Sequence, residues 1–151
     1  MQIKNSSSTY LGLFGYIDGG TVKNLRMVDA DIQDSNVSYA GAVAGYMVNA
    51  CVENITVDSL SMTVLRYGTT RFGSVVGYCK NTTFSYISVN NSLIDATFSD
   101  TSGYCGGVAG NVSESTINNS YVSGDITVKT SISSTTSKSV YVGGIFGGAD
   151  S

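Results

Sequence analysis

The residues in this sequence that could most readily do chemistry are aspartates. The candidates are Asp29 with Asp31 or with Asp58, Asp95 with Asp100, and Asp125. Two carboxyl groups about 5–9 Å apart can serve as the acid and the base of glycoside hydrolysis. Aspartate also forms turns at strand ends, and no arginine or lysine aligns with these positions. The pattern therefore favours turn formation, and we expect no catalytic residue and no enzyme.

The chain offers little that would bind a metal or a cofactor. It contains three cysteines and no histidine, and without histidine a tetrahedral zinc site is not expected. Cys51, Cys79 and Cys105 lie at different distances from the repeated glycines described below, so stacked coils would not bring them together. An odd number of cysteines also argues against a disulfide framework. We expect small, buried thiols, with no metal, cofactor or cofactor-binding residue.

The composition argues against two classes of partner. Only 13% of the 151 residues are charged, the net charge is −3, and the eight basic residues are scattered, whereas nucleic acid requires a basic stripe. No apolar run of about eighteen residues occurs, so no membrane insertion is predicted. The chain is rich in β-branched residues and contains ten tyrosines, which favours an all-β protein.

A glycine-centred repeat must position any functional side chain in this protein. The last glycine of each copy serves as an anchor, and successive anchors are 30, 32, 33 and 37 residues apart, a spacing typical of solenoids. The anchors are Gly15, Gly45, Gly77, Gly110 and Gly147. The resulting units span residues 10–38, 39–70, 71–103 and 104–139, with a partial unit at 140–151.

Side chains at fixed distances from the anchors form columns. Equivalent positions of stacked parallel coils lie about 4.8 Å apart, so such columns become ladders. We expect aliphatic, aromatic and amide ladders whose role is structural. The aliphatic columns are Leu13, Val43, Val75, Val108 and Ile145; Val22, Val52, Phe84 and Ile117; and Met27, Val57, Val89 and Val122. The aromatic column is Tyr16, Tyr46 and Tyr78 with Asn111, and the amide column is Asn24, Asn54 and Asn119 with Tyr86.

Each unit is expected to follow the same local course. In the first, a strand over Tyr10–Ile17 contains the glycine box, and a turn follows at Asp18–Gly20. Thr21–Ile32 then forms two short strands with a bend near Val28–Asp29. Two glycine columns suggest a corner at each end of a three-residue strand within the box. The return connections at 33–38, 65–70, 99–103 and 131–139 carry the length variation, and such connections often form the binding face of a solenoid.

The stretches LGLFGYIDGGTVKNLRMVDADI and YCGGVAGNVSESTINNSYVSGDIT closely resemble the GLUG repeat, named for its Gly-Leu-hydrophobic-Gly box. The resemblance covers nearly the whole chain, and the third unit departs most, with Ser74 in the box and Tyr86 in the amide column. It implies a right-handed parallel β-helix (β-solenoid) of about four and a half coils. It also implies a bacterial secreted or cell-surface protein, since such repeats occur in adhesin-like proteins and IgA-specific metallopeptidases.

The pattern thus predicts a non-enzymatic structural or adhesive segment of a longer extracellular bacterial protein. Its expected partners are a surface glycan or protein and a second copy that stacks end to end through Ile145 and Phe146. The alternatives are a fragment of a carbohydrate-active β-helix enzyme and the scaffold region of a secreted peptidase, whose zinc motif has no counterpart here. Ice binding through Thr21, Thr83 and Thr116 is disfavoured, because Cys51 interrupts that column.

Overall fold

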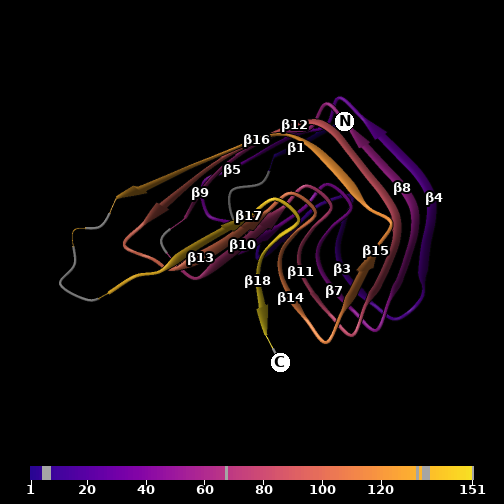
Figure 1. Ribbon diagram of the computed structural model, residues 1–151. Helices are drawn as coiled ribbons and strands as arrows, with labels where there is room; N and C mark the ends of the chain where they lie inside the picture. The colour runs from indigo at the N-terminus through magenta and orange to yellow at the C-terminus, as the bar shows by residue number, and fades with distance from the viewer. Residues whose placement is uncertain (5–7, 67, 132, 134–136, 151) are drawn as a thin grey trace.

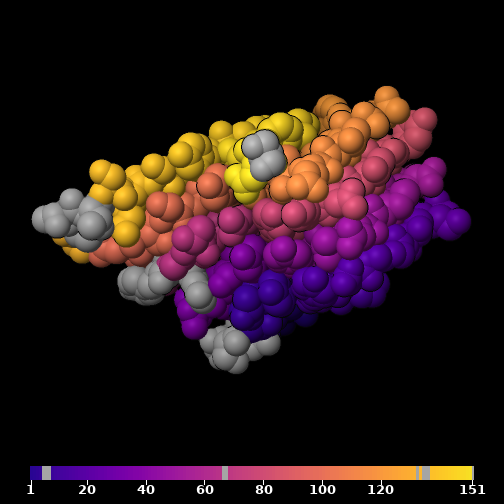
Figure 2. Space-filling model, turned by 90° about the horizontal axis from the view of Figure 1, so that it is seen from below, coloured from indigo at the N-terminus to yellow at the C-terminus, as the bar shows by residue number. Residues whose placement is uncertain are grey.

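The chain folds as a parallel β-solenoid, as the sequence predicts. The computed structural model describes residues 1–4, 8–66, 68–131, 133 and 137–150. These residues form an all-β structure of about four turns, and the coils stack as successive layers from the N-terminus to the C-terminus (Figure 2). Every strand pairing between coils is parallel.

Each turn passes through three sheets, which we call sheets B, C and A in the order that the chain follows (Figure 1). Sheet B consists of β2 (Tyr10–Leu11), β6 (Tyr39–Ala40), β10 (Thr70–Gly73), β13 (Gly103–Gly106) and β17 (Val140–Gly143). Sheet C consists of β3 (Phe14–Asp18), β7 (Ala44–Val48), β11 (Val76–Lys80), β14 (Ala109–Ser113) and β18 (Phe146–Asp150). Sheet A contains β1 (Gln2–Lys4), β4 (Thr21–Val28), β5 (Asp31–Asp34), β8 (Cys51–Asp58), β9 (Ser61–Arg66), β12 (Thr83–Ser99), β15 (Thr116–Asn118) and β16 (Tyr121–Ser131).

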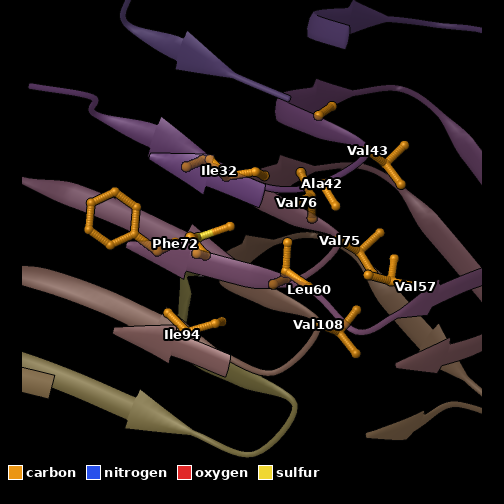
Figure 3. Close-up of a cluster of buried hydrophobic side chains, with 14 of the residues drawn as sticks. Ile32, Ala42, Val43, Val57, Leu60, Phe72, Val75, Val76, Ile94 and Val108 are labelled. Carbon is orange, nitrogen blue, oxygen red and sulfur yellow. The ribbon is translucent and has the colours of Figure 1, made fainter. Parts of the chain in front are cut away.

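The register places the expected aliphatic columns in the interior. Val22 pairs with Val52, Val52 with Phe84, and Phe84 with Ile117. Val52 and Phe84 are fully buried, whereas Val22 and Ile117, in the outer coils, are partly buried against the same core. Figure 3 shows another column of the interior, in which Val43, Val75 and Val108 of consecutive coils occupy equivalent positions. The predicted stacking is therefore confirmed, with full burial limited to the central coils.

The corners of sheet A are built on left-handed backbone. Three columns, four, nine and fourteen residues after the anchors, have positive φ: Gly19, Asn49, Asn81 and Glu114; Asn24, Asn54, Tyr86 and Asn119; and Asp29, Ser59, Asn91 and Gly124. Glycine, asparagine and aspartate tolerate this conformation best. The residues of the amide column thus have two roles. They adopt the left-handed backbone of the corner, and their side chains form a ladder, in which Asn54 Nδ2 donates to Asn24 Oδ1 at 2.8 Å. The expected bend near Val28–Asp29 is confirmed.

Tyr86 is the residue least suited to its corner, and replacing it should stabilise the protein. Its φ is 57°, a conformation that costs a bulky side chain roughly 1–2 kcal/mol, and its exposed ring contributes little burial. We expect Tyr86→Asn to raise the free energy of unfolding by about 1 kcal/mol, measured by chemical denaturation. Tyr121→Asn, at a position of ordinary φ, is the control that should not stabilise, and an equal gain in both variants would contradict the explanation.

The glycine box forms one corner and not the two that the sequence suggested. The second glycine column consists of Gly41, which directly follows β6, and Gly73, Gly106 and Gly143, which end the later strands of sheet B. The next two residues make the bend, and the anchors lie inside the strands of sheet C. In the first coil this segment is one residue shorter, because Leu11 pairs with Ala40 while Phe14 pairs with Ala44. The expected three-residue strand within the box is absent from the described chain, because the bend occupies that position.

The last local features are the return connections and residues 2–9, the polar lead-in that precedes the first unit. The lead-in contributes β1, whose Ile3 pairs with Ile32 and packs against the core. The connections leave sheet A and enter sheet B as expected, for example between β5 and β6. Residues 5–7 of the lead-in, residue 67 and residues 132 and 134–136 lie outside the described part of the chain.

Candidate functional site

A column of tyrosines interrupted by one arginine runs across sheet B. Pairing between successive strands places Tyr10, Tyr39, Arg71, Tyr104 and Tyr141 in register. These side chains precede the buried column that contains Leu11, Ala40, Phe72 and Cys105. Since neighbouring residues of a strand point to opposite faces, the tyrosines lie on the outer face of the sheet. The rings of Tyr104 and Tyr141 stack with centroids 5.1 Å apart.

A second column lies on sheet C and meets the first. It contains Tyr16, Tyr46 and Tyr78, followed in register by Asn111 and Gly148. Rings from the two sheets are in contact: the centroids of Tyr10 and Tyr46 are 5.6 Å apart, and those of Tyr39 and Tyr46 are 5.4 Å apart. These distances are typical of interacting aromatic pairs. We call the two columns together the tyrosine strip.

The anchor glycines allow the two columns to meet. A Cβ at Gly77 would lie 2.7 Å from Ala40 N, Arg71 O and Gly45 O, so sheet C crosses the backbone of sheet B with no space for a side chain. The chain therefore bends sharply between the two sheets (Figure 1), and the residue after each anchor faces the outer column of sheet B. Gly148 has a related role, because a Cβ there would meet the Tyr104 ring at 2.4 Å.

Arg71 occupies the middle of the tyrosine strip. Its guanidinium carbon lies 5.0–5.4 Å from the ring centroids of Tyr39, Tyr78 and Tyr104, within the range of cation–π interactions. Arg71 Nε donates to Asn111 Oδ1 at 3.3 Å, and one terminal nitrogen donates to the Tyr39 hydroxyl at 3.3 Å. These contacts fix the guanidinium plane in the coil at the centre of the strip.

The tyrosine strip is partly open to solvent and crowded with phenol groups. Tyr16 and Tyr141 are each 49% exposed, and the other rings are partly buried. Burial, together with the phenol groups of Tyr78, Tyr16, Tyr39 and Tyr10, raises the pKa of Tyr46. Tyr46 therefore stays a neutral hydrogen-bonding group at physiological pH. The strip presents aromatic faces, hydroxyls and one fixed cation.

The sequence revealed only part of this site. It showed the column of Tyr16, Tyr46 and Tyr78, to which we assigned a structural role, but it did not reveal the column on sheet B. The available signal was that a tyrosine or arginine lies six residues before every anchor, or five before the anchor of the shorter first unit. The return connections, predicted as the binding face, contribute Ser35 and Leu65 to an open hollow of about 1000 Å³ on sheet A, and none of its lining residues is aromatic.

Asp29 lies beside Asp58 of the next coil, since Asp29 N donates to Asp58 O at 3.0 Å, but Asp29, Asp31 and Asp58 have different structural roles. Asp29 has a positive φ at a corner, so the turn-forming interpretation is confirmed for it, and Asp58 forms an ion pair with Arg26 at 3.1 Å. Asp31 accepts hydrogen bonds from the Gln2 and Gln33 amides. The Gln2 bond is the main cause that lowers the pKa of Asp31, although burial opposes it. A lowered pKa suits a charged hydrogen-bond acceptor and does not suit a general acid.

The remaining candidate aspartates lie in or next to β12 and β16. Asp95 forms an ion pair with Lys129 at 3.0 Å, and Asp100 accepts a 2.6 Å hydrogen bond from Ser133 N at the end of the long strand β12. Five residues of extended chain separate these two aspartates by about 16 Å, farther than glycoside hydrolysis requires. Asp125 is exposed in β16, in register with Leu93.

The cysteines do not pair, and one of them differs from expectation. Cys79 and Cys105 are buried as predicted, but Cys51 is exposed. The reason is its column, because Cys51 is in register with Thr21 and Thr83, on the outward face of sheet A. Burial raises the pKa of Cys79 and of Cys105 from the ordinary 9.0 to about 12.

These thiols should therefore differ in reactivity. Only the thiolate attacks a thiol reagent, so in the native protein at pH 8 one equivalent should react, at Cys51, and three after denaturation. Rapid labelling of Cys51→Ser would contradict the burial of the other two. Because the folded-state pKa values are raised, the stability associated with these thiols is full below pH 9 and declines as pH rises towards 12.

Comparisons with known proteins identify no relative. No family model, curated protein or solved structure matches this chain. Within the described residues, no group of three or more cysteines, aspartates or glutamates is placed to hold a metal ion. Those residues also contain no helix long and apolar enough to cross a membrane.

Proposed function

We propose that this protein is a non-enzymatic β-solenoid segment with structural and adhesive roles, and that the tyrosine strip binds an extended glycan chain. The observation that carries the proposal is the strip itself. Seven tyrosines from five coils, joined at the centre by Arg71, form one surface on two sheets. Solvent-accessible aromatic residues gathered on one face mark interaction sites more often than isolated ones do.

The chemistry of the tyrosine strip suits a sugar polymer. The apolar C–H faces of pyranose rings pack on aromatic rings, and phenol hydroxyls donate and accept hydrogen bonds with sugar hydroxyls. The coils repeat about every 4.8 Å along the axis, which is close to the length of one sugar residue in an extended chain. A ligand lying along the strip would therefore meet similar contacts at successive residues. An extended peptide is the runner-up, since aromatic surfaces also bind such chains.

An extracellular, bacterial setting is part of the same proposal. It is supported by the surface rich in Ser, Thr and Asn, by the low charge and by the resemblance to GLUG repeats of secreted and cell-surface proteins. The non-enzymatic role is supported by the structural roles of the aspartates, each of which is engaged in a corner, an ion pair or a hydrogen bond, apart from the exposed Asp125. A secreted peptidase scaffold and a carbohydrate-active enzyme fragment remain the alternatives.

The test is glycan binding with matched tyrosine variants. We expect soluble polysaccharides to retard the protein in affinity electrophoresis, and Tyr46→Leu/Tyr78→Leu to weaken this binding at least tenfold, since each aromatic contact contributes about 1 kcal/mol. Tyr121→Leu, on sheet A, removes a more exposed ring outside the strip and should bind normally. Equal loss in both variants, binding to none of the polymers, or turnover of a glycan that disappears in Asp29→Asn would contradict the proposal.

A second proposed role is end-to-end association between copies of the chain. The column Phe14, Ala44, Val76, Ala109 and Phe146 is in register through sheet C. Its three inner members are buried, whereas Phe14 is 44% and Phe146 42% exposed. The strands at both ends also have unpaired edges, which bind further strands readily. Stacking the last coil of one copy on the first coil of another would cover both phenylalanines and propagate head to tail.

This association should be visible by analytical ultracentrifugation. The wild-type chain is expected to form dimers or longer assemblies as concentration rises, because stacking buries apolar side chains at both ends. Ile145→Lys/Phe146→Glu places two charges at the junction and should remain monomeric. Leu93→Lys changes an exposed apolar residue in the middle of sheet A and is the control that should associate like wild type. A wild-type chain that stays monomeric at high concentration would contradict this role.

A further inference from the structure

We propose that the glycan bound by the tyrosine strip is acidic, a linear polysaccharide that contains uronic acid, and that one of its carboxylates pairs with Arg71. This inference rests on the proposed function and adds the chemical class of the ligand. It follows from the placement of one fixed cation without a counter-ion at the centre of an aromatic surface.

Arg71 has no acidic partner within the described chain. The ion pairs there join Arg26 with Asp58, Lys80 with Glu114 and Lys129 with Asp95. Arg71 is partly buried, and its partners are three rings, the Asn111 amide oxygen and the Tyr39 hydroxyl. All of these groups are neutral acceptors or π faces, so the charge of Arg71 is held but not neutralised.

The guanidinium is well suited to a carboxylate. Its planar fork of N–H groups matches the two oxygens of a carboxyl group, and the surrounding rings and hydrogen bonds hold it in one place. Contacts to Asn111 Oδ1 and to the Tyr39 hydroxyl use Nε and one terminal nitrogen. Among the described residues the second terminal nitrogen has no hydrogen-bond acceptor, so it can donate to a ligand. Because the guanidinium is already held in place, it loses little conformational entropy when a ligand binds. More of the energy of the charge contact then appears as a difference in affinity between acidic and neutral ligands.

The position of Arg71 along the axis also fits a polymer. Tyr10 and Tyr39 precede it in sheet B, and Tyr104 and Tyr141 follow it. A uronate seated at Arg71 would therefore have neighbouring sugars over tyrosines in both directions. A neutral glycan would use the same rings but would leave the cation unpaired, so the strip should bind the acidic polymer more tightly.

The experiment compares two polymers with one backbone. Polygalacturonate and its fully methyl-esterified form have the same sugar rings, but only the first has carboxylates. We expect wild type to bind polygalacturonate at least about tenfold more tightly, the effect of a charge-assisted hydrogen bond, and to lose this preference as salt screens the pair. Arg71→Gln should bind both polymers equally, whereas Arg26→Gln, which removes an arginine from sheet A, should keep the preference.

The outcomes separate this inference from the proposed function. Equal affinity of wild type for the two polymers would overturn the acidic ligand while leaving glycan binding by the tyrosine strip intact. Retention of the preference for polygalacturonate in a folded Arg71→Gln variant would also overturn the inference, because the carboxylate would then be bound by another residue. Absence of binding to both polymers and to every other glycan would overturn the proposed function as well. The comparison in wild type requires no variant, so it stands even where Arg71→Gln fails to fold.

Discussion

Replacing Phe84 with alanine is expected to lower the free energy of unfolding by about 3–5 kcal/mol, as truncation of a buried phenylalanine typically does. Phe84 is fully buried in the central coils, and it is in register with Val52 in one neighbouring coil and Ile117 in the other. The alanine would leave a cavity that both neighbours line. In a solenoid, stability depends on contacts between adjacent coils, so one truncation weakens two interfaces.

The matched control lies in the same column. Ile117 is only partly buried against the core, because no strand of the described residues covers β15 on its other side. We expect Ile117→Ala to cost about 1–2 kcal/mol, since less apolar area leaves water. Both values follow from chemical denaturation monitored by far-UV circular dichroism. An equal loss of unfolding free energy in the two variants would show that Phe84 and Ile117 are buried to the same extent, and thus that the register is wrong.

Replacing Gly77 with alanine is expected to be similarly damaging, at about 3 kcal/mol or more. The added Cβ would lie 2.7 Å from three backbone atoms, Ala40 N, Arg71 O and Gly45 O. Overpacking typically costs about 1–3 kcal/mol when neighbouring side chains can move aside. Here the neighbours are backbone atoms held in two sheets, which move less readily, so the cost should be at the upper end of this range or above it. The bend between sheets B and C would therefore open or the coil would not form.

Gly15 provides the matched control at the same position of the first coil. A Cβ there would meet nothing closer than 3.6 Å, at Tyr10 O, because β3 is the edge strand of sheet C in the described part of the chain. Gly15→Ala should therefore change stability by less than about 1 kcal/mol. If Gly77→Ala folds with wild-type stability, the two sheets do not cross as closely as described and the tyrosine strip is not formed by the glycine corner.

The periodic part of the fold could be predicted from the sequence. The identical offsets of Val52 and Phe84 from their anchors reveal their pairing, because parallel coils convert equal spacing into contact. The corner at the glycine box was less predictable, since glycine columns are compatible both with tight bends and with close backbone approach. The structure has one bend and, at Gly77, a close approach. The exposed position of Cys51 was predictable, since threonines occupy the rest of its column.

The candidate site was harder to predict, because it depends on an angle between sheets. Spacing alone identifies Tyr46 and Tyr78 as one column but does not show which other column they face. The column on sheet B also mixes tyrosine with Arg71, so it does not stand out as a run of like residues. Only the bend brings Tyr39 to within 5.4 Å of Tyr46, measured between ring centroids. Such a contact between non-equivalent positions is invisible to a comparison of repeats.

The most direct test of the tyrosine strip as the binding surface is NMR of ring-labelled tyrosines during titration with polygalacturonate. Nine of the ten tyrosines lie in the described part of the chain, seven of them in the strip and two on sheet A. We predict that the ring signals of Tyr39, Tyr46 and Tyr78 shift progressively, while those of Tyr86 and Tyr121, which lie on sheet A, stay unchanged. Shifts confined to Tyr86 and Tyr121, or no shift at any ring at saturating polymer, would contradict the assignment of binding to the strip.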